Sequence, residues 1–374
     1  PGLLALVTLA FHRRRLGGLL ALSGAVPALG VGLYPPLSQD ASYRWLLLDT
    51  RFGVDEAGAI FLLFTAVIWL LASGFAFGWI TRQRERFFAL FLLTMSGNLG
   101  ALVAQDMPSF YTFFALMSFA AYGLIAHERT REARHAANVY IVLVVIGEAA
   151  LAAALIIAAG SIGANDFLSV REGLEALPLS HLIIALAFLG FGIKAGVLIL
   201  HVWLPLAHPV APAPASAVLS GTIIVTGLVG WLRFLPVGEW ALPGWGGTCV
   251  ALGLAAAFYG AIIGTDQREP KVVLAYSSIS QMGIITTGLG IGALRPEAWL
   301  EIQAAVLIYA THHALSKGAL FLGVGPAHLA QTRWQLATAR VALLVPALAL
   351  AGAPFTSGAL AKVAIKSNLA FLPG

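Results

Sequence analysis

Long apolar runs follow one another along almost the whole chain, and they limit its fold more than any other feature. They lie near residues 1–11, 16–34, 56–80, 87–105, 108–126, 137–160, 181–205, 213–235, 247–264, 272–293, 298–325 and 338–371. A helix that crosses a bilayer takes about 20 apolar residues. The runs are continuous rather than alternating at every second residue, which excludes a membrane β-barrel. The sequence therefore predicts an all-α, polytopic membrane protein with about twelve transmembrane helices.

The composition supports the same class of protein. Only 10% of the 374 residues are charged, against about 25% in soluble proteins, so a water-facing surface cannot be built. The single cysteine, Cys249, excludes a disulfide framework and a thiolate metal cluster. A net charge of +5 in a membrane chain indicates loop orientation and not nucleic-acid binding. The first run is too short to span a bilayer and begins at Pro1, so we expect the N-terminus to be incomplete.

The basic residues predict the orientation of the chain. Thirteen of the 22 Lys and Arg residues fall at one set of alternate loops, five at the other set, and four inside apolar runs. The first set, here called the Arg-rich side, includes the loops around Arg82, Arg129, Arg268 and Arg333. Because Lys and Arg collect in cytoplasmic loops, we expect this side to be cytoplasmic and the membrane to be a bacterial-type inner membrane.

Five ionisable Lys and Glu side chains lie within the apolar runs and away from the ends of the helices: Glu148, Lys194, Lys317, Lys362 and Lys366. Each costs about 2.5–3.5 kcal/mol to insert, and such groups usually face the protein interior or a water path. Glu148 and Lys194 lie near the middle of their runs and could pair, either as a static link between helices or as a proton site. Lysine at all four basic positions favours proton exchange, because the lysine pKa shifts readily on burial and that of arginine does not. Lys366 could instead extend to the membrane interface.

Two histidines accompany one of these lysines. His313 and Lys317 are four residues apart and share a helix face, with His312 beside them. Neutral imidazole donates and accepts a proton, which suits a relay, although a lone histidine could also be a satisfied core residue. We expect no metal site, because no cysteine or acid nearby completes a ligand set. We expect no cofactor either, because the chain has no CxxC pair and no Gly-rich phosphate loop after a strand.

Proline and glycine interrupt two of the helices that carry a lysine. Pro205 and Pro209 follow Lys194, while Gly352, Pro354 and Gly358 precede Lys362. Proline removes an amide donor and clashes with the preceding turn, and such breaks are tolerated only inside protein or around water. A lysine beside a break in two separate segments is typical of transporters that are built from repeats.

A family pattern is carried by four ordered segments: GIKAGVLILHVWLPLAHPVAPAPASAVLSG, TDQREPKVVLAYSSISQMG, HHALSKGALFLGVG and GAPFTSGALAK. With RFGVDEAGAIFLLFTAVIWLL near the start, they resemble the antiporter-like subunits of respiratory complex I, a family shared with Mrp-type cation/proton antiporters and membrane-bound hydrogenases. The resemblance runs from about residue 48 to 366. It implies N-terminal helices over 1–86 and two inverted five-helix repeats with broken helices, each a half-channel, over 87–235 and 236–374. The second repeat would be incomplete.

The resemblance also implies roles for individual residues. Lys194 matches the essential lysine of the family's first broken helix. His313 and Lys317 match the pair that connects the two half-channels, and Lys362 matches the lysine of the terminal channel. Secondary relay positions are expected at Ser220, His312, His201 and His208.

Some positions depart from the family pattern. Ala115 stands where the family usually has a glutamate, and Ser220 stands where it has a central lysine or histidine. We expect Glu148, on the next helix, to supply the missing carboxylate. Ser220 and water would have to bridge the gap in the relay.

Three functions follow from this reading. The first is a proton-translocating subunit of a redox-driven, multi-subunit complex similar to NADH:quinone oxidoreductase or a hydrogenase, with no redox site of its own. The second is a non-redox cation/proton antiporter or ion-coupled uptake subunit, such as one that accumulates inorganic carbon with a soluble partner. The third is a structural anchor that no longer conducts. The expected partners are other membrane and peripheral subunits, the lipid bilayer and protons or Na⁺, and no nucleic acid.

Overall fold

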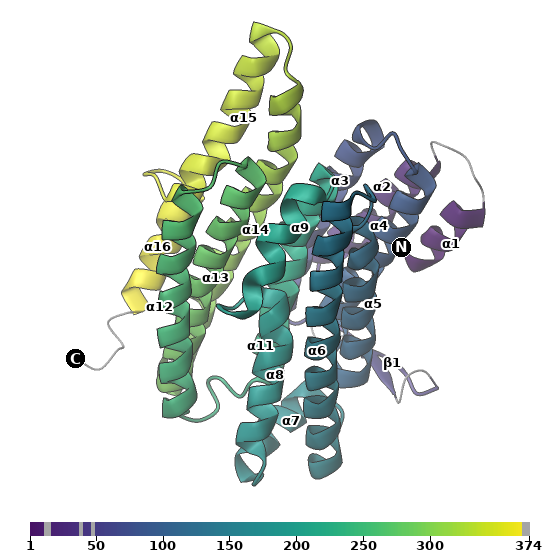
Figure 1. The fold of residues 1–374 in the computed structure, drawn as a ribbon. Helices are drawn as coiled ribbons and strands as arrows, with labels where there is room; N and C mark the ends of the chain where they lie inside the picture. Colours follow the sequence, from purple (N-terminus) through teal and green to yellow (C-terminus); the bar gives the residue numbers. More distant parts are fainter. Residues whose placement is uncertain (11–15, 37–39, 46–48, 369–374) are drawn as a thin grey trace.

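The chain folds into a bundle of long helices with one small hairpin (Figure 1). A computed structural model describes residues 1–10, 16–36, 40–45 and 49–368; Arg13, Arg14 and Arg15, counted above for orientation, lie outside the described residues. The first half contains α1 (Gly2–Ala10), α2 (Leu16–Leu33), β1 (Ala41–Tyr43), β2 (Thr50–Phe52), α3 (Glu56–Trp79), α4 (Arg84–Val103), α5 (Met107–Ile125), α6 (Arg131–Ile162) and α7 (Phe167–Gly173). The second half contains α8 (Ser180–Ala195), α9 (Trp203–Val210), α10 (Ala213–Val218), α11 (Ile224–Phe234), α12 (Pro243–Thr265), α13 (Pro270–Leu294), α14 (Trp299–Leu329), α15 (Arg333–Ala351) and α16 (Ser357–Asn368).

Short irregular helices complete the list of elements. Three are 3₁₀ segments: η1 (Leu174–Ala176), η2 (Leu200–Val202) and η4 (Pro296–Ala298). The fourth, η3 (Leu219–Ile223), is a π-helical segment that joins α10 to α11. Strands β1 and β2 pair antiparallel, with Ser42 opposite Arg51. The hairpin and α7 lie at one end of the bundle, and the connection between α14 and α15 lies at the other, Arg-rich end (Figure 1).

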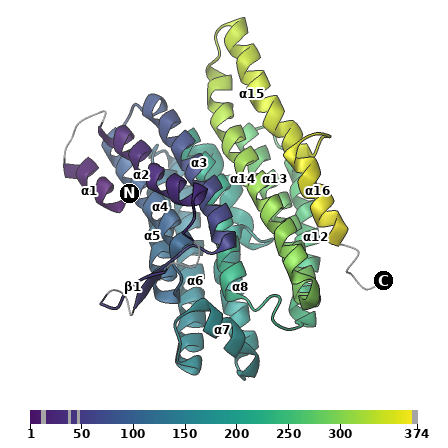
Figure 2. The ribbon, with the colours of Figure 1, turned by 180° about the vertical axis from the view of Figure 1, so that it is seen from behind.

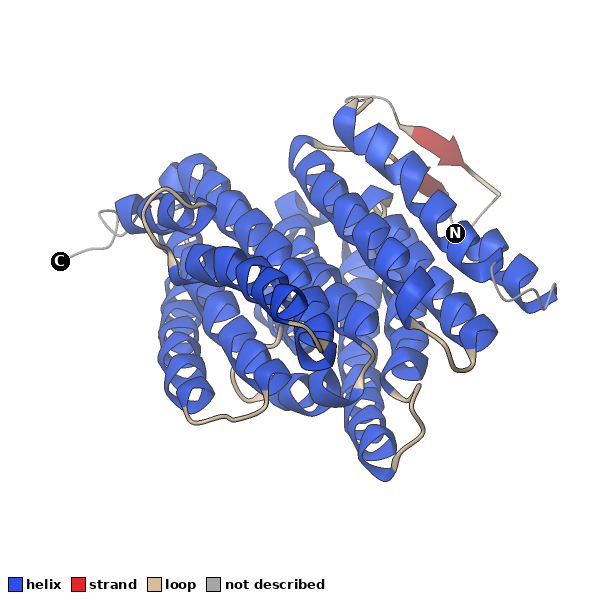
Figure 3. Cartoon of the chain, turned by 90° about the horizontal axis from the view of Figure 1, so that it is seen from above, coloured by secondary structure: helices blue, strands red, loops and turns tan. Residues whose placement is uncertain are grey.

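The prediction of an all-α membrane protein is confirmed, but fewer helices than the predicted twelve are long and apolar enough to cross a membrane. Within the described residues, ten helices are long and apolar enough to cross a membrane. The two predicted runs outside this set are α1, which has 9 residues, and α14, whose apolar sequence is interrupted by His312, His313 and Lys317. Seen from above, the helices stand side by side as in a membrane bundle (Figure 3). The chain is an all-α, polytopic membrane protein.

The order of elements recurs along the chain. A packed pair (α4 and α5), a third helix (α6), a broken helix (α8 and α9) and the α10–α11 span come first. A second packed pair (α12 and α13), a long helix (α14) and a second broken helix (α15 and α16) follow. Two five-helix repeats would produce this order, and the proposed division at residues 87 and 236 stays a prediction.

The first break lies closer to Lys194 than predicted. Helix α8 ends one residue after Lys194, and Gly196 caps it in the left-handed conformation at φ 73°. Pro205 and Pro209 do not make this break, because both lie inside α9. Pro205 is tolerated there because the amides of a helix's first turn have no intrahelical partner. The lysine is therefore placed at the very end of a half-helix inside the membrane.

The second break is confirmed, with one correction. Gly352 caps α15 in the left-handed conformation at φ 72°, and Pro354 lies in the link before α16. Gly358, predicted to belong to the break, lies instead in the first turn of α16. Helices α15 and α16 stand at one edge of the bundle in views from both sides (Figures 1 and 2).

Candidate functional site

Lys194 lies in a buried polar cluster between α5, α6 and α8. Its ammonium donates a hydrogen bond to the hydroxyl of Tyr140 over 3.0 Å, and that hydroxyl donates to the carbonyl of Ser118 over 3.0 Å. The Glu148 carboxylate lies beside the Ser118 side chain and interacts electrostatically with Lys194. We call these four residues, Glu148, Ser118, Tyr140 and Lys194, the Lys194 cluster. All four are buried.

The predicted meeting of Glu148 and Lys194 takes an indirect form. No ion pair within 4.0 Å joins them among the described residues, and Glu148 Oε2 has no hydrogen-bond partner there. Aromatic rings enclose the lysine instead: its Nζ lies 5.0 Å from the ring centroid of Tyr140 and 5.7 Å from that of Phe114. A cation over an aromatic face is attracted by the ring quadrupole. The ammonium of Lys194 is thus stabilised by the more distant Glu148 carboxylate, by the Tyr140 hydroxyl and by two aromatic rings.

Glu148 lies close to Ala115, the position where the family usually has a glutamate. Ser118 is three residues after Ala115 on α5, so the two share a helix face. Glu148 reaches Ser118 from the neighbouring helix α6. The carboxylate is therefore delivered to within one turn of Ala115, from a different helix.

Lys317 lies in a second buried polar cluster, between α13, α14 and η3. Its ammonium donates to the Leu274 carbonyl over 2.7 Å and to the hydroxyl of Ser277. The Ser278 hydroxyl donates to the same carbonyl over 3.1 Å and lies 3.0 Å from the hydroxyl of Ser220. We call Ser220, Ser277, Ser278 and Lys317 the Lys317 cluster. Ser220 thus connects to Lys317 through Ser278 and one backbone carbonyl.

The histidines take different positions around this cluster. His313 is fully buried near Lys317, and neither of its ring nitrogens has a partner in the described part of the chain. His312 Nδ1 lies 2.9 Å from the Ser357 hydroxyl at the start of α16, so it links α14 to the second broken helix. His201 accepts a hydrogen bond from the Ile199 amide over 3.1 Å, which holds the chain at the first break. His208 is fully buried on α9, where its ring stacks on Phe321 of α14 at 4.4 Å between centroids, and neither ring nitrogen has a partner among the described residues.

Two predicted connections are not made directly. Within the described residues, no hydrogen bond joins the Lys194 cluster to the Lys317 cluster. Lys362 lies on an exposed face of α16, and its ammonium donates to the carbonyl of Ala351 at the end of α15. Lys366 is exposed as well. Lys362 therefore caps a helix terminus here, and it interacts electrostatically with His312.

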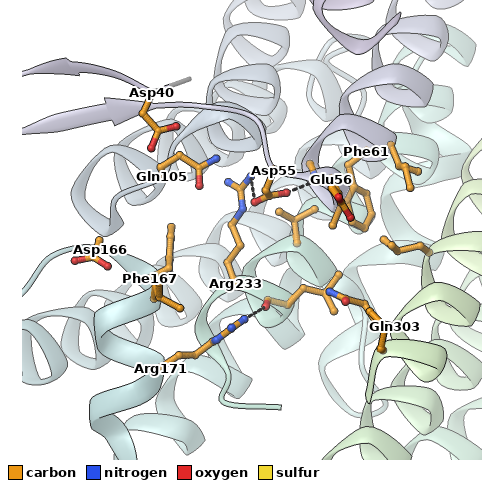
Figure 4. A pocket seen from close by; sticks show the side chains of 18 of the residues that line it. Asp40, Asp55, Glu56, Phe61, Gln105, Asp166, Phe167, Arg171, Arg233 and Gln303 are labelled. Carbon is orange, nitrogen blue, oxygen red and sulfur yellow. Dashed lines mark hydrogen bonds and ion pairs between the residues drawn. The ribbon is translucent and has the colours of Figure 1, made fainter. Parts of the chain in front are cut away.

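A charged cavity of about 710 Å³ lies at the end of the bundle opposite the Arg-rich side (Figure 4). Arg233, at the end of α11, points into it toward Asp55, with 3.4 Å between Nη2 and Oδ2. The buried guanidinium also donates to the carbonyls of Ala101, Leu102 and Ala104 at the end of α4. A cation is favoured at a helix C-terminus. Arg233 therefore ties the start of α3 and the end of α4 to α11.

Asp166, which is the N-cap of α7, lines the same cavity. Burial would raise the pKa of its carboxyl, but hydrogen bonds from Ser169 and the charge of Arg51 outweigh burial and hold that pKa below its ordinary value. The group is therefore a carboxylate near neutral pH, and it adds negative charge to the rim.

Several site residues escaped the sequence analysis. Tyr140 and Ser118 read as ordinary members of apolar runs. Arg233 is one of the five basic residues counted at the loops opposite the Arg-rich side, but it is buried. The family segment TDQREPKVVLAYSSISQMG contains Ser277 and Ser278, so the two serines after Tyr276 were a signal that could have been used. No group of three or more His, Cys, Asp or Glu that could hold a metal ion occurs among the described residues.

Comparison with known proteins decides the family. The model of the family described as NADH:quinone oxidoreductase/Mrp antiporter, transmembrane, matches residues 104–370. The chain belongs to this family. The predicted resemblance to antiporter-like subunits is confirmed.

Individual relatives agree with this assignment. A Staphylococcus saprophyticus protein named as an antiporter subunit is 31% identical over 350 residues, which cover 85% of this chain and 43% of that one. Hydrogenase-4 component B of Escherichia coli is 28% identical over 292 residues, covering 74% and 43%. The chain thus spans less than half the length of these relatives. A chain of the Mrp complex from Dietzia sp. has the same fold, with a TM-score of 0.84 at 23% identity over 98% of this chain and 71% of that one.

Proposed function

We propose that this chain carries protons, or Na⁺ in exchange for them, across the membrane as one subunit of a multi-subunit energy-converting complex. The observation that carries the proposal is the pair of buried polar clusters around Lys194 and Lys317. An uncompensated lysine in a bilayer is costly, and both lysines are buried and held by side chains that can exchange protons. A chain that served only as an anchor would have no use for them.

The proposed route begins at the Lys194 cluster. The distance between Lys194 and the Glu148 carboxylate sets how strongly the ammonium form is favoured, because an opposite charge nearby stabilises it. A movement of α6 relative to α8 would change that distance and release or bind a proton at Lys194. Tyr140, bonded to the lysine, would hold the amine in place through the change.

The middle of the route runs through Ser220. Its hydroxyl lies 3.0 Å from the Ser278 hydroxyl, and the Ser278 hydroxyl and the Lys317 ammonium both donate to the Leu274 carbonyl, over 3.1 and 2.7 Å. Because a carbonyl accepts hydrogen bonds but has no proton to pass on, water would have to carry the proton from Ser278 to Lys317. Water would have to complete the path between Lys194 and Ser220. His313 beside Lys317 would then pass protons on, and His312 leads through Ser357 to the second broken helix that carries Lys362.

The test is proton transport by the whole complex in membrane vesicles, followed with a pH-sensitive dye. Lys194→Ala and Lys317→Ala should each abolish transport while the complex still assembles. Lys366→Ala is the matched control, since Lys366 is an exposed lysine of α16, and it should transport at the rate of the unaltered protein. Unchanged transport in both Lys194→Ala and Lys317→Ala would show that the clusters are structural.

The same vesicles separate the two sources of energy. The relative from E. coli is a hydrogenase component, which favours a redox-driven complex, and the staphylococcal relative and the Dietzia structure favour an antiporter. Transport that needs an electron donor selects the first. Transport driven by an imposed Na⁺ gradient alone selects the second. The subunits that co-purify in mild detergent provide an independent readout: iron–sulfur subunits for the first, and a soluble partner without redox centres for ion-coupled uptake.

We also propose that the Arg-rich side faces the cytoplasm of a bacterial-type cell. The support is the thirteen-to-five distribution of basic residues. A reporter enzyme that is active only in the cytoplasm, inserted into the loop at Arg129, should be active. Absence of activity there would contradict the proposed orientation.

A further inference from the structure

A groove of about 790 Å³ lies between α3, α14 and α15. Helices α14 and α15 stand side by side in views from both sides (Figures 1 and 2), and the end of α3 forms the third wall. The lining is mostly apolar and includes Phe75, Leu322 and Pro326, whereas Gln335 and Thr338 are polar. The proposed function uses none of these residues.

The groove has the depth of one leaflet of a bilayer. Its lining on α14 extends from Ala319 to Leu329, a distance of about 15 Å at the rise of a helix. The hydrocarbon core of a bilayer is about 30 Å thick, so one leaflet takes up about 15 Å of it. Leu329 ends α14 at the Arg-rich side. The groove therefore begins at that surface and reaches about the middle of the membrane.

Two tryptophans line the groove at its mouth, the end on the Arg-rich side. Trp79 is the last residue of α3, and Trp334, which is 84% exposed, lies in the first turn of α15. Tryptophan is enriched at the level of the lipid head groups, because its ring is amphipathic. The mouth thus lies at head-group level, and the rest of the groove lies at the level of the acyl chains.

A second cavity, of about 440 Å³, adjoins the mouth, since Trp79 and Leu329 line both spaces. The charged residues that line this adjoining cavity are Glu128, Glu269 and Lys271. No ion pair within 4.0 Å joins the lysine to either glutamate in the described part of the chain. The adjoining cavity therefore presents one cation and two carboxylates that do not pair directly with one another.

These charged groups have capacity left for a ligand. The Lys271 ammonium has three N–H donors, and one of them is used in a 2.6 Å hydrogen bond to the Ala211 carbonyl. Both glutamates are exposed. A phosphate could accept hydrogen bonds from the remaining donors of Lys271, and an ammonium could donate to the carboxylates. Such hydrogen bonds between ionised groups are about twice as strong as those between neutral groups.

The groove and the adjoining cavity together match one kind of molecule. An acyl chain fills an apolar groove and supplies the dispersion contacts that an empty groove lacks. Phosphatidylethanolamine joins its acyl chains to a phosphate and, two carbons further on, to a primary ammonium. A choline head group has no N–H to donate, and a glycerol head group has no cation for the glutamates. A helix of another subunit would cover the groove but leave the three charged groups without partners.

We infer that the groove and the adjoining cavity bind phosphatidylethanolamine of the Arg-rich leaflet. An acyl chain lies along α14, the phosphate binds Lys271, and the ammonium binds Glu128 and Glu269. The lipid also supplies contacts that α15 lacks, because Ala339 is the one residue listed as buried on that helix in the described part of the chain. The inference goes beyond the proposed function and does not depend on transport.

Binding is measured by photolabelling of the whole complex. The complex is reconstituted into vesicles of phosphatidylcholine that contain a minor fraction of phosphatidylethanolamine with a photoactivatable group on one acyl chain. After irradiation, mass spectrometry locates the label, which should be found at groove residues such as Phe75 and Leu322. Phosphatidylcholine with the same photoactivatable chain is the control, and it should label the groove about tenfold less, because it lacks the charge-assisted hydrogen bonds to the glutamates.

Variants of the charged residues test the head group. Lys271→Met and the double variant Glu128→Gln with Glu269→Gln should each lower labelling of the groove by phosphatidylethanolamine about tenfold. Lys271→Arg should keep the labelling, because a guanidinium also binds phosphate. If these changes have no effect, or if both lipids label the groove equally, the assignment of the head group is overturned.

A matched pair of variants on α15 tests the position of the acyl chain. Ala342→Trp places a large ring in the groove and should abolish its labelling. Val341→Trp, at the neighbouring residue, which is 61% exposed and does not line the groove, should leave the labelling unchanged. A groove that takes no label from either lipid in the unaltered complex is covered by another protein segment, and that result would overturn the lipid site. None of these measurements requires transport, so they stand apart from any failure of the proposed function.

Discussion

The two broken helices carry a lysine in similar sequence surroundings, but the structure gives the two lysines opposite environments. Lys194 is buried, bonded to Tyr140 and placed near the carboxylate of Glu148. Lys362 is exposed and bonds to the backbone carbonyl of Ala351. Both breaks follow a left-handed glycine, Gly196 or Gly352. The breaks are thus alike in backbone and unlike in what surrounds them.

The difference comes from packing. Helix α8 lies against α6, which brings Glu148 and the Tyr140 ring to the lysine, and the Phe114 ring comes from α5. Helix α15 has one buried side chain, Ala339, which is still 9% exposed, and α16 packs mainly on α14. A break in a helix creates free backbone groups, but only neighbouring helices turn it into a site for an ion. The following predictions test this contrast, from the largest expected effect to the smallest.

Removing the buried ammonium should have the largest effect on stability. Lys194→Met leaves the Glu148 carboxylate without its cation at membrane depth, and losing one partner of a buried pair costs about 3–5 kcal/mol. Glu148→Gln together with Lys194→Met removes both charges and should recover most of that loss. Unfolding of the detergent-solubilised complex by sodium dodecyl sulfate measures both values. Equal losses in the single and double variants would mean that the two charges do not interact.

Replacing the capping glycine should also destabilise the complex more at the first break than at the second. Gly196→Ala places a Cβ in the left-handed region and 2.5 Å from Leu204 Cδ1 in the buried break, so we expect a loss of about 2 kcal/mol. Gly352→Ala has the same backbone cost, but its Cβ meets the flexible side chain of Lys362, which can move away. Its loss should be about 1 kcal/mol. The same unfolding titration compares them, and a larger loss at Gly352 would reverse the contrast.

The fold could be predicted further than the site. Uninterrupted apolar runs and the distribution of Arg residues are enough to place helices, because the bilayer demands satisfied backbone groups and long apolar segments. The ionisable residues inside those runs, Glu148, Lys194 and Lys317, were visible for the same reason. Their cost in a membrane marks them without any knowledge of tertiary contacts.

The contacts of those residues could not be predicted. Tyr140 and Ser118 reach Lys194 and Glu148 only because α5, α6 and α8 pack together, and nothing in their local sequence indicates it. The position of the first break was also misjudged. Proline was taken as the breaking residue, whereas Gly196 ends α8 and Pro205 is accommodated in the first turn of α9. Proline marks a helix start as readily as a helix end.

Removing the hydroxyl that holds Lys194 should have a moderate effect. Tyr140→Phe keeps the ring that faces the ammonium but removes its hydrogen-bond acceptor, and an unmade buried bond costs about 1–2 kcal/mol. Tyr111→Phe is a matched control, because the Tyr111 hydroxyl lies 3.4 Å from a backbone carbonyl and is only partly buried. It should change the unfolding midpoint by less than half as much. Equal shifts would show that Lys194 gains nothing from Tyr140.

The smallest change is expected at the second lysine. Lys362→Met removes a cation from the end of α15, where the favourable interaction with the helix carbonyls is weakened by solvent exposure, so the loss should be below about 0.5 kcal/mol. Lys366→Met, on the same helix and equally exposed, serves as the control and should behave alike. The decisive comparison is with Lys194→Met in the same unfolding titration of the whole complex. If Lys362→Met costs as much as Lys194→Met, then other subunits enclose Lys362 in the complex and supply its counter-charge, and the contrast between the two broken helices belongs to the chain alone. If its cost stays small, the chain itself holds only the buried, acid-coupled lysine of the first broken helix, and the contrast between the two breaks stands.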